Sequence, residues 1–336
     1  MAPTSGAAVT TEALPYILIG LIDDSGPGFG ESTDRLLDGV VTGVGLGPQP
    51  EPVPATRCRA GDESTPYNRQ GMSVYLSLTR AFNEGALRAI LSSGQAVVVH
   101  RLALMSKDGD WILRERPEAL RHVLQVLEKR GARYRFGAPL DVRWMEGGWS
   151  SHLEFSADSL RVRTDFVTRP PRLSHSDLIA LWREVESSDV PVVDPRRLAE
   201  LKKTNREKDY AVIGELARLL ADPGDRLMLS RSARDLVMLG RDHPDLVSEL
   251  IPRRSLLALL DAPIADLEAA LDSERRGLIH ANEERLLAYA DAAADWRRLW
   301  PELDRKTEGM PLREAHEIIA ENAAGTLPFR PLESRS

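Results

Sequence analysis

Strict alternation of polar and apolar positions predicts strands in the middle of the chain. Residues 151–156 (SHLEFS) follow a glycine-containing stretch and alternate with a period of two, so His152 and Glu154 would share one face of a strand. A second strand is expected over 160–167 (LRVRTDFV), ended by the Arg-Pro-Pro sequence at 169–171. The segment ARYRF (132–136) predicts a third strand. These three segments would form one sheet.

Apolar positions that recur with helical spacing flank these strands. The segment 117–131 begins with a proline and ends with a glycine, as a helix often does. Helices are also expected over 73–91, 176–186 and 196–220, and residues 137–145 predict a short helix or loop. We expect a strand at 96–99 that continues toward HRLALM, and a hairpin whose turn is KDGDW (107–111). From Pro223 to about residue 303 the pattern is helical throughout.

The first part of the chain gives a weaker pattern. An apolar run (16–22, YILIGLI) predicts a strand, a helix-like stretch covers 34–40, and 43–70 is rich in Pro, Gly and Arg and predicts a loop. The sequence SGPGFGEST (25–33) stands where a phosphate-binding loop would stand, but Glu31 replaces the lysine that such a loop needs and would repel phosphate. Capping of a helix by Ser32 or Thr33 is the favoured interpretation.

These elements predict an α+β fold, with a mixed sheet flanked by helices and an α-helical C-terminal region. We divide the chain into an N-terminal segment of uncertain fold with long loops (1–90), an α/β domain (91–220), a helical region (221–325) and a tail (326–336). The length of 336 residues suits one large domain or two medium ones.

Composition excludes several classes of protein. A formal net charge of −7 argues against a protein that simply coats nucleic acid, although it leaves room for a local basic cleft. The single cysteine, Cys58, excludes an internal disulfide framework and a cysteine-based zinc site, and fits a reducing compartment. No apolar run approaches the roughly 20 residues of a membrane helix, and the start lacks a basic secretion signal. We therefore expect a cytoplasmic protein without a membrane partner.

Three polar residues of the predicted strands carry candidate chemistry. Neighbouring strands lie about 4.7 Å apart, so pairing of the two strands would bring Asp165 close to His152 and Glu154. Two carboxylates and an imidazole suit a divalent cation, Mg²⁺ for the oxygens, with the histidine favouring Mn²⁺ or another transition metal. The simpler interpretation is a polar outer face of a half-exposed strand, with Asp165 paired to Arg161 or Arg163.

The order of these motifs resembles the nucleotidyltransferase superfamily, which has the DNA polymerase β-like fold, and its small toxin-like members. The resemblance covers roughly residues 115–220. It rests on Gly137-Ala138 after a first strand, His152-Leu153-Glu154 on the next strand and Asp165 on the one after. A helical sequence, KKTNREKD (202–209), resembles the basic motif of the toxin-like members. At helical spacing, Lys202, Arg206 and Asp209 would lie on one face, although a solvated helix face has the same pattern.

The resemblance implies a metal-dependent transfer of a nucleoside monophosphate from an NTP to a hydroxyl of a protein or RNA acceptor, in a toxin or phage-defence setting with an antitoxin or another partner protein. Mg²⁺ or Mn²⁺ would be held by Glu154, Asp165 and His152, with Asp165 as the base. The residues implied for the nucleotide are the amides of Gly137 and Ala138, the hydroxyls of Ser150 and Ser151, and the side chains of Lys202, Arg206, Lys208 and Asp209.

Two departures from the family pattern keep other functions open. Ala138 stands at a position that is glycine or serine in the family, and His152 replaces the first carboxylate. One alternative is therefore a catalytically degenerate protein that binds a nucleotide or a partner on the same fold. A second alternative is a helical scaffold whose α/β unit is only structural.

Overall fold

The structure is a computed structural model that describes residues 66–331, and side chains from residue 74 onward. The predicted strand at 16–22, the glycine-rich loop at 25–33 and the helix-like stretch at 34–40 lie outside the described residues. The elements are, in chain order, α1 (Pro66–Phe82), β1 (Ala89–Ser92), α2 (Ser93–Val99), β2 (Asp108–Leu113), α3 (Pro117–Glu128), β3 (Arg133–Gly137), α4 (Val142–Met145), β4 (Ser151–Ala157), β5 (Leu160–Val167), α5 (His175–Glu184), α6 (Pro195–Leu201), α7 (Glu207–Arg218), α8 (Pro223–Leu229), α9 (Ala233–Asp242), α10 (Pro244–Leu250), η3 (Ser255–Leu259), α11 (Ile264–Ala292), α12 (Ala294–Thr307) and α13 (Leu312–Thr326).

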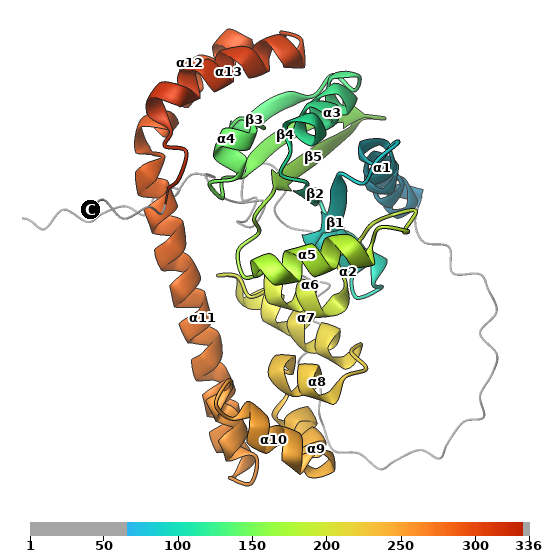
Figure 1. Cartoon of the computed structure of the whole chain (residues 1–336), viewed down its shortest axis with the longest axis vertical. Helices are drawn as coiled ribbons and strands as arrows, with labels where there is room; N and C mark the ends of the chain where they lie inside the picture. Colours follow the sequence, from blue (N-terminus) through green and yellow to red (C-terminus); the bar gives the residue numbers. More distant parts are fainter. Residues whose placement is uncertain (1–65, 332–336) are drawn as a thin grey trace, which may run out of the picture.

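The predicted α+β architecture is confirmed, with a mixed sheet, flanking helices and a helical C-terminal region (Figure 1). The strand order is β1-β2-β5-β4-β3. Strands β2 and β5 run parallel, and the other neighbouring pairs are antiparallel. Strand β5 therefore lies in the centre, between β2 on one side and β4 on the other.

The two faces of the sheet are buried in different ways. On one face, Trp111, Leu153 and Phe166 form part of a core with Phe82 of α1 and Leu120 of α3. The rings of Trp111 and Phe166 stack there at 5.6 Å between centroids. On the other face, the apolar residues at the β1 and β2 edge, including Ile90 and Ile112, pack against α5, α6 and α7. Because side chains alternate along a strand, the polar residues between these core positions are brought to this second face.

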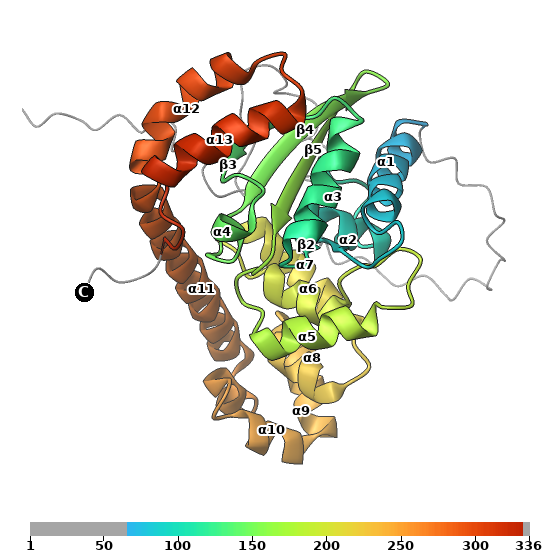
Figure 2. The same ribbon diagram turned by 45° about the horizontal axis from the view of Figure 1, so that its top comes forward.

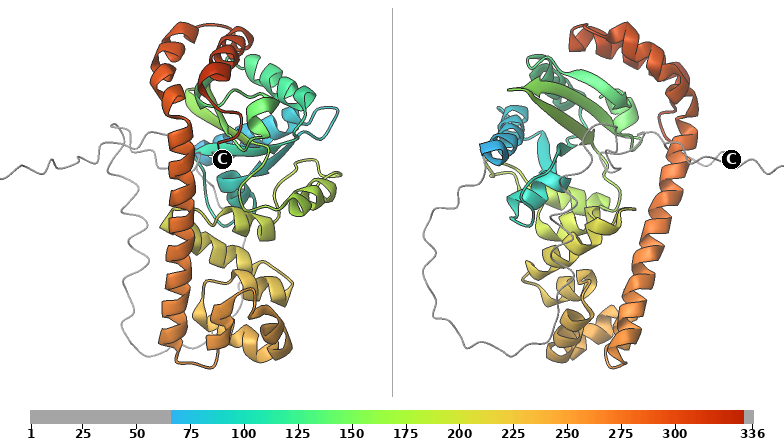
Figure 3. Two further views of the ribbon diagram at one scale, coloured as in Figure 1. Left: turned by 60° about the vertical axis from the view of Figure 1, so that its left-hand side comes forward. Right: turned by 180° about the vertical axis from the view of Figure 1, so that it is seen from behind.

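The helical C-terminal region returns to the sheet at its end. Helices α8 to α10, η3 and the first turns of α11 form a separate apolar cluster. Helix α11 has 29 residues and so spans about 43 Å. It runs from that cluster past the sheet to α12 and α13, which lie beside β3 (Figures 2 and 3). The indole nitrogen of Trp296 on α12 donates to the carbonyl of Gly137 at 3.0 Å. None of the helices in the described part of the chain is long and apolar enough to cross a membrane.

Several predicted elements are confirmed. Strand β5 has the predicted bounds, 160–167, and β4 begins at Ser151. Helix α3 begins at Pro117, and Gly131 after it adopts a φ of 67°. The short helix predicted within 137–145 is α4.

Other predicted elements are wrong. Residues 96–99 are helical, because Gln95 to Val98 are buried in a short helix whose packing outweighs the strand preference of valine. KDGDW is not a turn, since β2 begins at Asp108. The helix predicted over 73–91 ends at Phe82 and is followed by β1, and the loop predicted up to residue 70 gives way to α1 at Pro66. The helix predicted over 196–220 is broken between α6 and α7 at residues 202–206.

Candidate active site

His152 and Asp165 lie directly opposite each other on the antiparallel strands β4 and β5. His152 Nδ1 is 2.8 Å from Asp165 Oδ1, and His152 Nε2 is 2.8 Å from the hydroxyl oxygen of Ser150. With Asp165 ionised, Nδ1 donates its proton to the carboxylate, and the Ser150 hydroxyl can serve Nε2 as donor or as acceptor. All three residues are buried. Both ring nitrogens of His152 are therefore occupied within the protein.

Asp165 keeps its charge despite its burial. Burial by itself would raise its pKa, but His152, and then Arg135, hold the pKa below the ordinary carboxyl value. Arg135 Nη2 donates to Asp165 Oδ1 at 3.0 Å. The second carboxylate oxygen, Oδ2, is buried and has no hydrogen-bond partner in the described structure. Asp165 thus presents one oxygen that is fixed and one that is available.

Glu154 shares the face of His152 and Asp165, as the alternation predicts, but has different partners. It lies opposite Arg163 of β5 rather than opposite Asp165. Arg133 Nη2 donates to Oε1 at 2.6 Å, and Arg161 Nη2 lies 2.7 Å from Oε2. Both oxygens of Glu154 are therefore engaged by arginines, and the structure does not join Glu154 and Asp165 at one point.

The Gly137-Ala138 pair is part of the packing around His152. The amide of Ala138 donates to the carbonyl of Ser150 at 2.9 Å, so it is already used within the protein. Gly137 has a φ of 102°, and a Cβ atom at this position would stand 2.6 Å from His152 Cδ2. The hydroxyl of Ser151 is buried without a hydrogen-bond partner in the described structure and, as the residue before His152, faces the other side of the strand.

The structure places a carboxylate beside Asp165 that the sequence reasoning missed. Asp110 of β2 lies opposite Asp165 in the parallel register, and Asp108 occupies the same face two residues earlier. Burial, followed by the charges of Asp165 and Asp108, holds the pKa of Asp110 well above the ordinary carboxyl value. The spacing Asp108-x-Asp110 in front of an apolar run was the available signal, but the glycine between the two residues favoured a turn.

The break between α6 and α7 carries two cations that act on Asp110. The charges of Lys202 and Arg206 both lower the pKa of Asp110. Lys202 Nζ is 3.4 Å and Arg206 Nη2 is 2.9 Å from the carboxylate of Asp209, whose Oδ2 also accepts from the Thr204 hydroxyl at 2.6 Å. Asp209 therefore orients the two cations. Burial, with the nearby charge of Arg206, lowers the pKa of Lys202.

The predicted convergence of Lys202, Arg206 and Asp209 is thus present, although they do not lie on one continuous helix. Lys202 caps the end of α6, Arg206 precedes α7, and Asp209 lies in the first turn of α7. The loop, rather than helical spacing, brings them together. Lys208 is exposed on α7.

The side chains present at this site decide whether a metal ion fits it. No group of three or more His, Cys, Asp or Glu side chains within residues 66–331 is arranged to hold a metal ion. A pair of carboxylates is nevertheless present, since Asp110 and Asp165 face each other and Asp165 Oδ2 has no hydrogen-bond partner among the described residues. Mg²⁺ is commonly held by one or two carboxylates together with phosphate oxygens and water. These residues fit such an ion.

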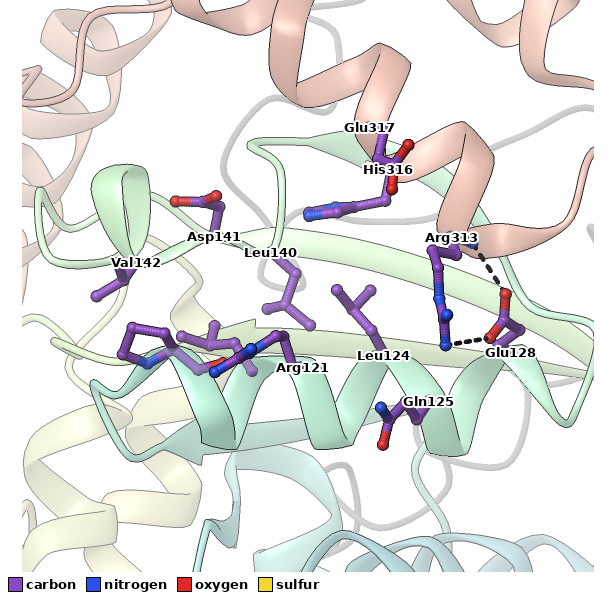
Figure 4. Close-up of a pocket in the computed structure, with 12 residues that line it drawn as sticks. Arg121, Leu124, Gln125, Glu128, Leu140, Asp141, Val142, Arg313, His316 and Glu317 are labelled. Carbon is purple, nitrogen blue, oxygen red and sulfur yellow. Dashed lines mark hydrogen bonds and ion pairs between the residues drawn. The ribbon is translucent and has the colours of Figure 1, made fainter.

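A cavity lies on the opposite side of the sheet. It has a volume of about 440 Å³ and is lined by α3, α4 and α13 (Figure 4). His316 and Asp141 face it from above, and Arg313 pairs with Glu128 at its edge. None of the residues predicted from the sequence as site residues lines this cavity.

Comparisons with known proteins give one kind of match. No family model matches the sequence, and no curated protein matches it. Among solved structures, this chain is similar to a protein from H. pylori described as a candidate nucleotidyltransferase. The match covers 64% of this chain and 97% of the H. pylori chain, with 14% sequence identity and a TM-score of 0.34. The chain is also similar to JHP933 from Helicobacter pylori. That match covers 66% of this chain and 95% of JHP933, with 14% sequence identity and a TM-score of 0.35.

Proposed function

We propose that this protein is a nucleotidyltransferase whose centre is formed by Asp110 and Asp165. The observation that carries the proposal is their cross-strand pairing on β2 and β5, with Asp108 on the same face and two cations, Lys202 and Arg206, nearby. Carboxylates that face each other beside cations suit phosphoryl transfer, in which a metal and basic side chains neutralise the charge of the transferred group.

Each group has a role that its surroundings support. Asp110 and Asp165 would hold Mg²⁺ or Mn²⁺, which when bound neutralises charge on the phosphates. Lys202 and Arg206 are oriented by Asp209 and would bind phosphate oxygens, Arg206 by a fork and Lys202 as a point charge. His152 holds Asp165 Oδ1 and thereby leaves Oδ2 for the ligand. The acceptor of the nucleotide would be a hydroxyl of a protein or RNA.

This arrangement differs from the set implied by the family resemblance, in which His152, Glu154 and Asp165 hold the metal and Gly137, Ala138, Ser150 and Ser151 hold phosphates. That set requires His152 and Glu154 to give up partners at 2.6–2.8 Å. Breaking a buried ion pair or leaving a buried group unpaired costs several kcal/mol. The pairing of Asp110 with Asp165 requires no such loss.

The experiment that tests the proposal is incubation of the protein with each labelled NTP, Mg²⁺ or Mn²⁺ and a cell extract, with label scored on protein and on RNA. We expect labelling by the unmodified chain and a loss of at least about 100-fold in Asp110→Asn and Asp165→Asn, because each removes charge from the metal site. Glu154→Gln is the matched control on the same face of the sheet. Retained labelling in Asp110→Asn with loss in Glu154→Gln would favour the set implied by the resemblance.

A nucleotide-binding protein without turnover is the second candidate. It is favoured by His152, which stands where the family has a carboxylate. Binding of an NTP that raises the thermal midpoint, without release of pyrophosphate in Mg²⁺ or Mn²⁺, would identify it. A ligand at 100 times its Kd stabilises the folded state by about 2.7 kcal/mol, which thermal unfolding resolves readily.

A further inference from the structure

Two arginines beside the α6–α7 loop have no acidic partner among the described residues. Arg172 follows β5 in the loop that leads to α5, and Arg285 lies on α11. Neither forms an ion pair with a carboxylate in the described part of the chain, whereas neighbouring arginines such as Arg231 and Arg254 both bind Glu274. The two side chains are therefore cationic positions that the fold leaves uncompensated, in a chain whose formal net charge is −7.

The two arginines line a small cavity together. It has a volume of about 20 Å³, is walled by Pro171, Leu201 and Leu286, and has no carboxylate in its lining. The remaining lining residues are polar or cationic: Lys203, Thr204, Asn205 and Asn282. Such a volume holds one water-sized group, so one oxygen of a larger anion fits inside while the rest lies between the guanidinium groups.

The positive charges of Arg172 and Arg285 repel each other. Burial first, and then the charge of Arg172, lower the pKa of Arg285, whereas Tyr289 raises it. Two cations held close together without an anion are destabilising, and an anion placed between them removes that repulsion. Lys203, the third cation of the lining, is already paired with Glu200 at 2.7 Å.

The backbone fixes this arrangement. Arg172 adopts a φ of 71°, which an L-residue rarely adopts, directly after Pro170 and Pro171. Asn282 on α11 donates to the carbonyl of Lys203 at 2.8 Å, which ties α11 to the α6–α7 loop beside Arg285. The same loop carries Lys202 and Arg206, whose charges lower the pKa of Asp110. The cavity and the carboxylate pair therefore border the same loop.

We propose that Arg172 and Arg285 form a second phosphate-binding subsite, separate from the position that Lys202 and Arg206 serve. This inference deepens the proposed function, because a transferase must hold two substrates, and a phosphate of the acceptor RNA and the phosphate tail of the donor NTP are the two sources that this chemistry fits. Guanidinium groups bind phosphate oxygens through paired N–H donors, and two of them suit one phosphate.

The test is binding without metal or turnover. Affinity is measured in EDTA for a short fluorescein-labelled single-stranded RNA by anisotropy, and for ATP by calorimetry, in the unmodified full chain and in Arg172→Gln, Arg285→Gln and the double variant. We expect each single change to lower the affinity for one of the two ligands by at least about 10-fold, because a charged hydrogen bond is lost. For RNA, each change should also reduce the slope of log K against log salt by about 0.7.

Three further comparisons serve as controls for the loss of charge and for the loss of stability. Arg276→Gln removes the same charge from α11 at an exposed residue that pairs with Asp272 and does not line the cavity, and it should leave both affinities unchanged. Arg285→Lys keeps the charge without the fork and should give an intermediate loss. Arg172 is exposed, so Arg172→Gln tests the subsite even if Arg285→Gln lowers the thermal midpoint.

The possible results distinguish acceptor RNA from donor NTP as the source of the phosphate, and they distinguish failure of the subsite from failure of the proposed function. A lower affinity for RNA alone assigns the subsite to the acceptor, and a lower affinity for ATP alone assigns it to the donor. Affinities for both ligands that equal those of Arg276→Gln would overturn the subsite. Asp110→Asn should lose nucleotide transfer yet keep the arginine-dependent binding in EDTA. Absence of transfer by the unmodified chain, with that binding intact, would reject the proposed function and leave the subsite in place.

Discussion

At the scale of single residues, the protein contains two neighbouring carboxylates with opposite properties. Asp165 has His152 and Arg135 on one oxygen, and these cations and donors keep its pKa low. Asp110 lies beside it, and burial together with the charges of Asp165 and Asp108 raises its pKa. A cation placed between the two would relieve the repulsion that raises the pKa of Asp110. The residue pair is thus unfavourable in isolation and suited to a cationic ligand.

The first prediction concerns Asp110→Asn, which should stabilise the protein while it abolishes transfer. Because the folded pKa of Asp110 is raised, the folded state binds the proton more tightly than the unfolded state, and folding loses stability as the pH rises above the ordinary carboxyl value of 3.8. Asparagine does not ionise and avoids this loss. Thermal unfolding without metal should give a higher midpoint for Asp110→Asn at neutral pH and a smaller difference near pH 4. An unchanged or lower midpoint at neutral pH would contradict the prediction.

The second prediction concerns His152 as a positioning residue. His152→Ala removes the donor to Asp165 Oδ1 and should weaken Mn²⁺ binding by about 10- to 100-fold, the range for loss of a partner of a metal ligand. Titration followed by electron paramagnetic resonance measures the free ion directly. Glu154→Gln is the control and should bind Mn²⁺ as the unmodified chain does. Equal losses in both variants would instead indicate that Glu154 itself ligates the metal.

At the scale of elements, α13 is attached to the edge strand β3 by a polar contact. The Tyr134 hydroxyl lies 2.7 Å from His316 Nδ1 and accepts from the amide of Leu140 at 3.0 Å, and the two rings stack. Since that hydroxyl has one proton to donate, the neutral histidine accepts it at Nδ1. Burial lowers the pKa of His316, which keeps the ring neutral. The attachment of α13 therefore depends on an uncharged histidine.

The third prediction follows from the sign of that shift. Because the folded pKa of His316 lies below 6.5, the unfolded state binds more protons, and stability falls as the pH drops from about 6.5 toward the folded pKa. Urea unfolding between pH 8 and pH 5 should therefore show a loss of stability that is smaller in His316→Gln. His280 is exposed and pairs with Glu284, so His280→Gln is the control and should keep the steeper loss. Equal slopes in all three proteins would reject this role of His316.

At the scale of the whole molecule, the C-terminal helices connect a distant helical cluster to the sheet. Helix α11 leaves the cluster around Leu227 and Leu236, contacts the α6–α7 loop through Asn282, and reaches the β3–β4 side at Tyr289. On the next helix, α12, the indole of Trp296 donates a hydrogen bond to the carbonyl of Gly137 at the end of β3. The part of the chain that follows residue 264 is thus a brace along the β3 edge of the sheet, and its last helix, α13, packs with α3 on the face opposite to Asp110 and Asp165.

The fourth prediction tests this brace. Trp296→Ala removes a buried indole and its hydrogen bond to Gly137, and should cost about 3–5 kcal/mol of unfolding free energy. Hydrogen exchange should increase at Gly137 and Ala138, which pack against His152. Arg298→Ala, an exposed residue on the same helix that pairs with Asp295, should cost less than about 1 kcal/mol. Loss of similar size in both variants would show that α12 acts through charge rather than through Trp296.

The features that depend on local periodicity can be predicted from the amino-acid sequence. The bounds of β5, the start of α3 at Pro117 and the shared face of His152 and Glu154 follow from period-two and helical spacing and from proline and glycine at helix ends. The face shared with Asp165 also follows, because strands 151–157 and 160–167 are joined by a short turn that makes them neighbours. The helical C-terminal region follows from its continuous helical pattern.

The contacts between residues that are distant in the sequence depend on the packing of the whole fold. Asp110 and Asp165 are more than 50 positions apart, and the parallel pairing of β2 with β5 sets their register, which no local pattern encodes. The helical state of 96–99 likewise depends on burial against β2 and α6, which outweighs the strand preference of its valines. The type and spacing of Glu154 predict a metal ligand, yet two arginines from neighbouring strands occupy its oxygens. Hydrophobic periodicity fixes which face a side chain occupies, and the order and register of the strands fix its partners.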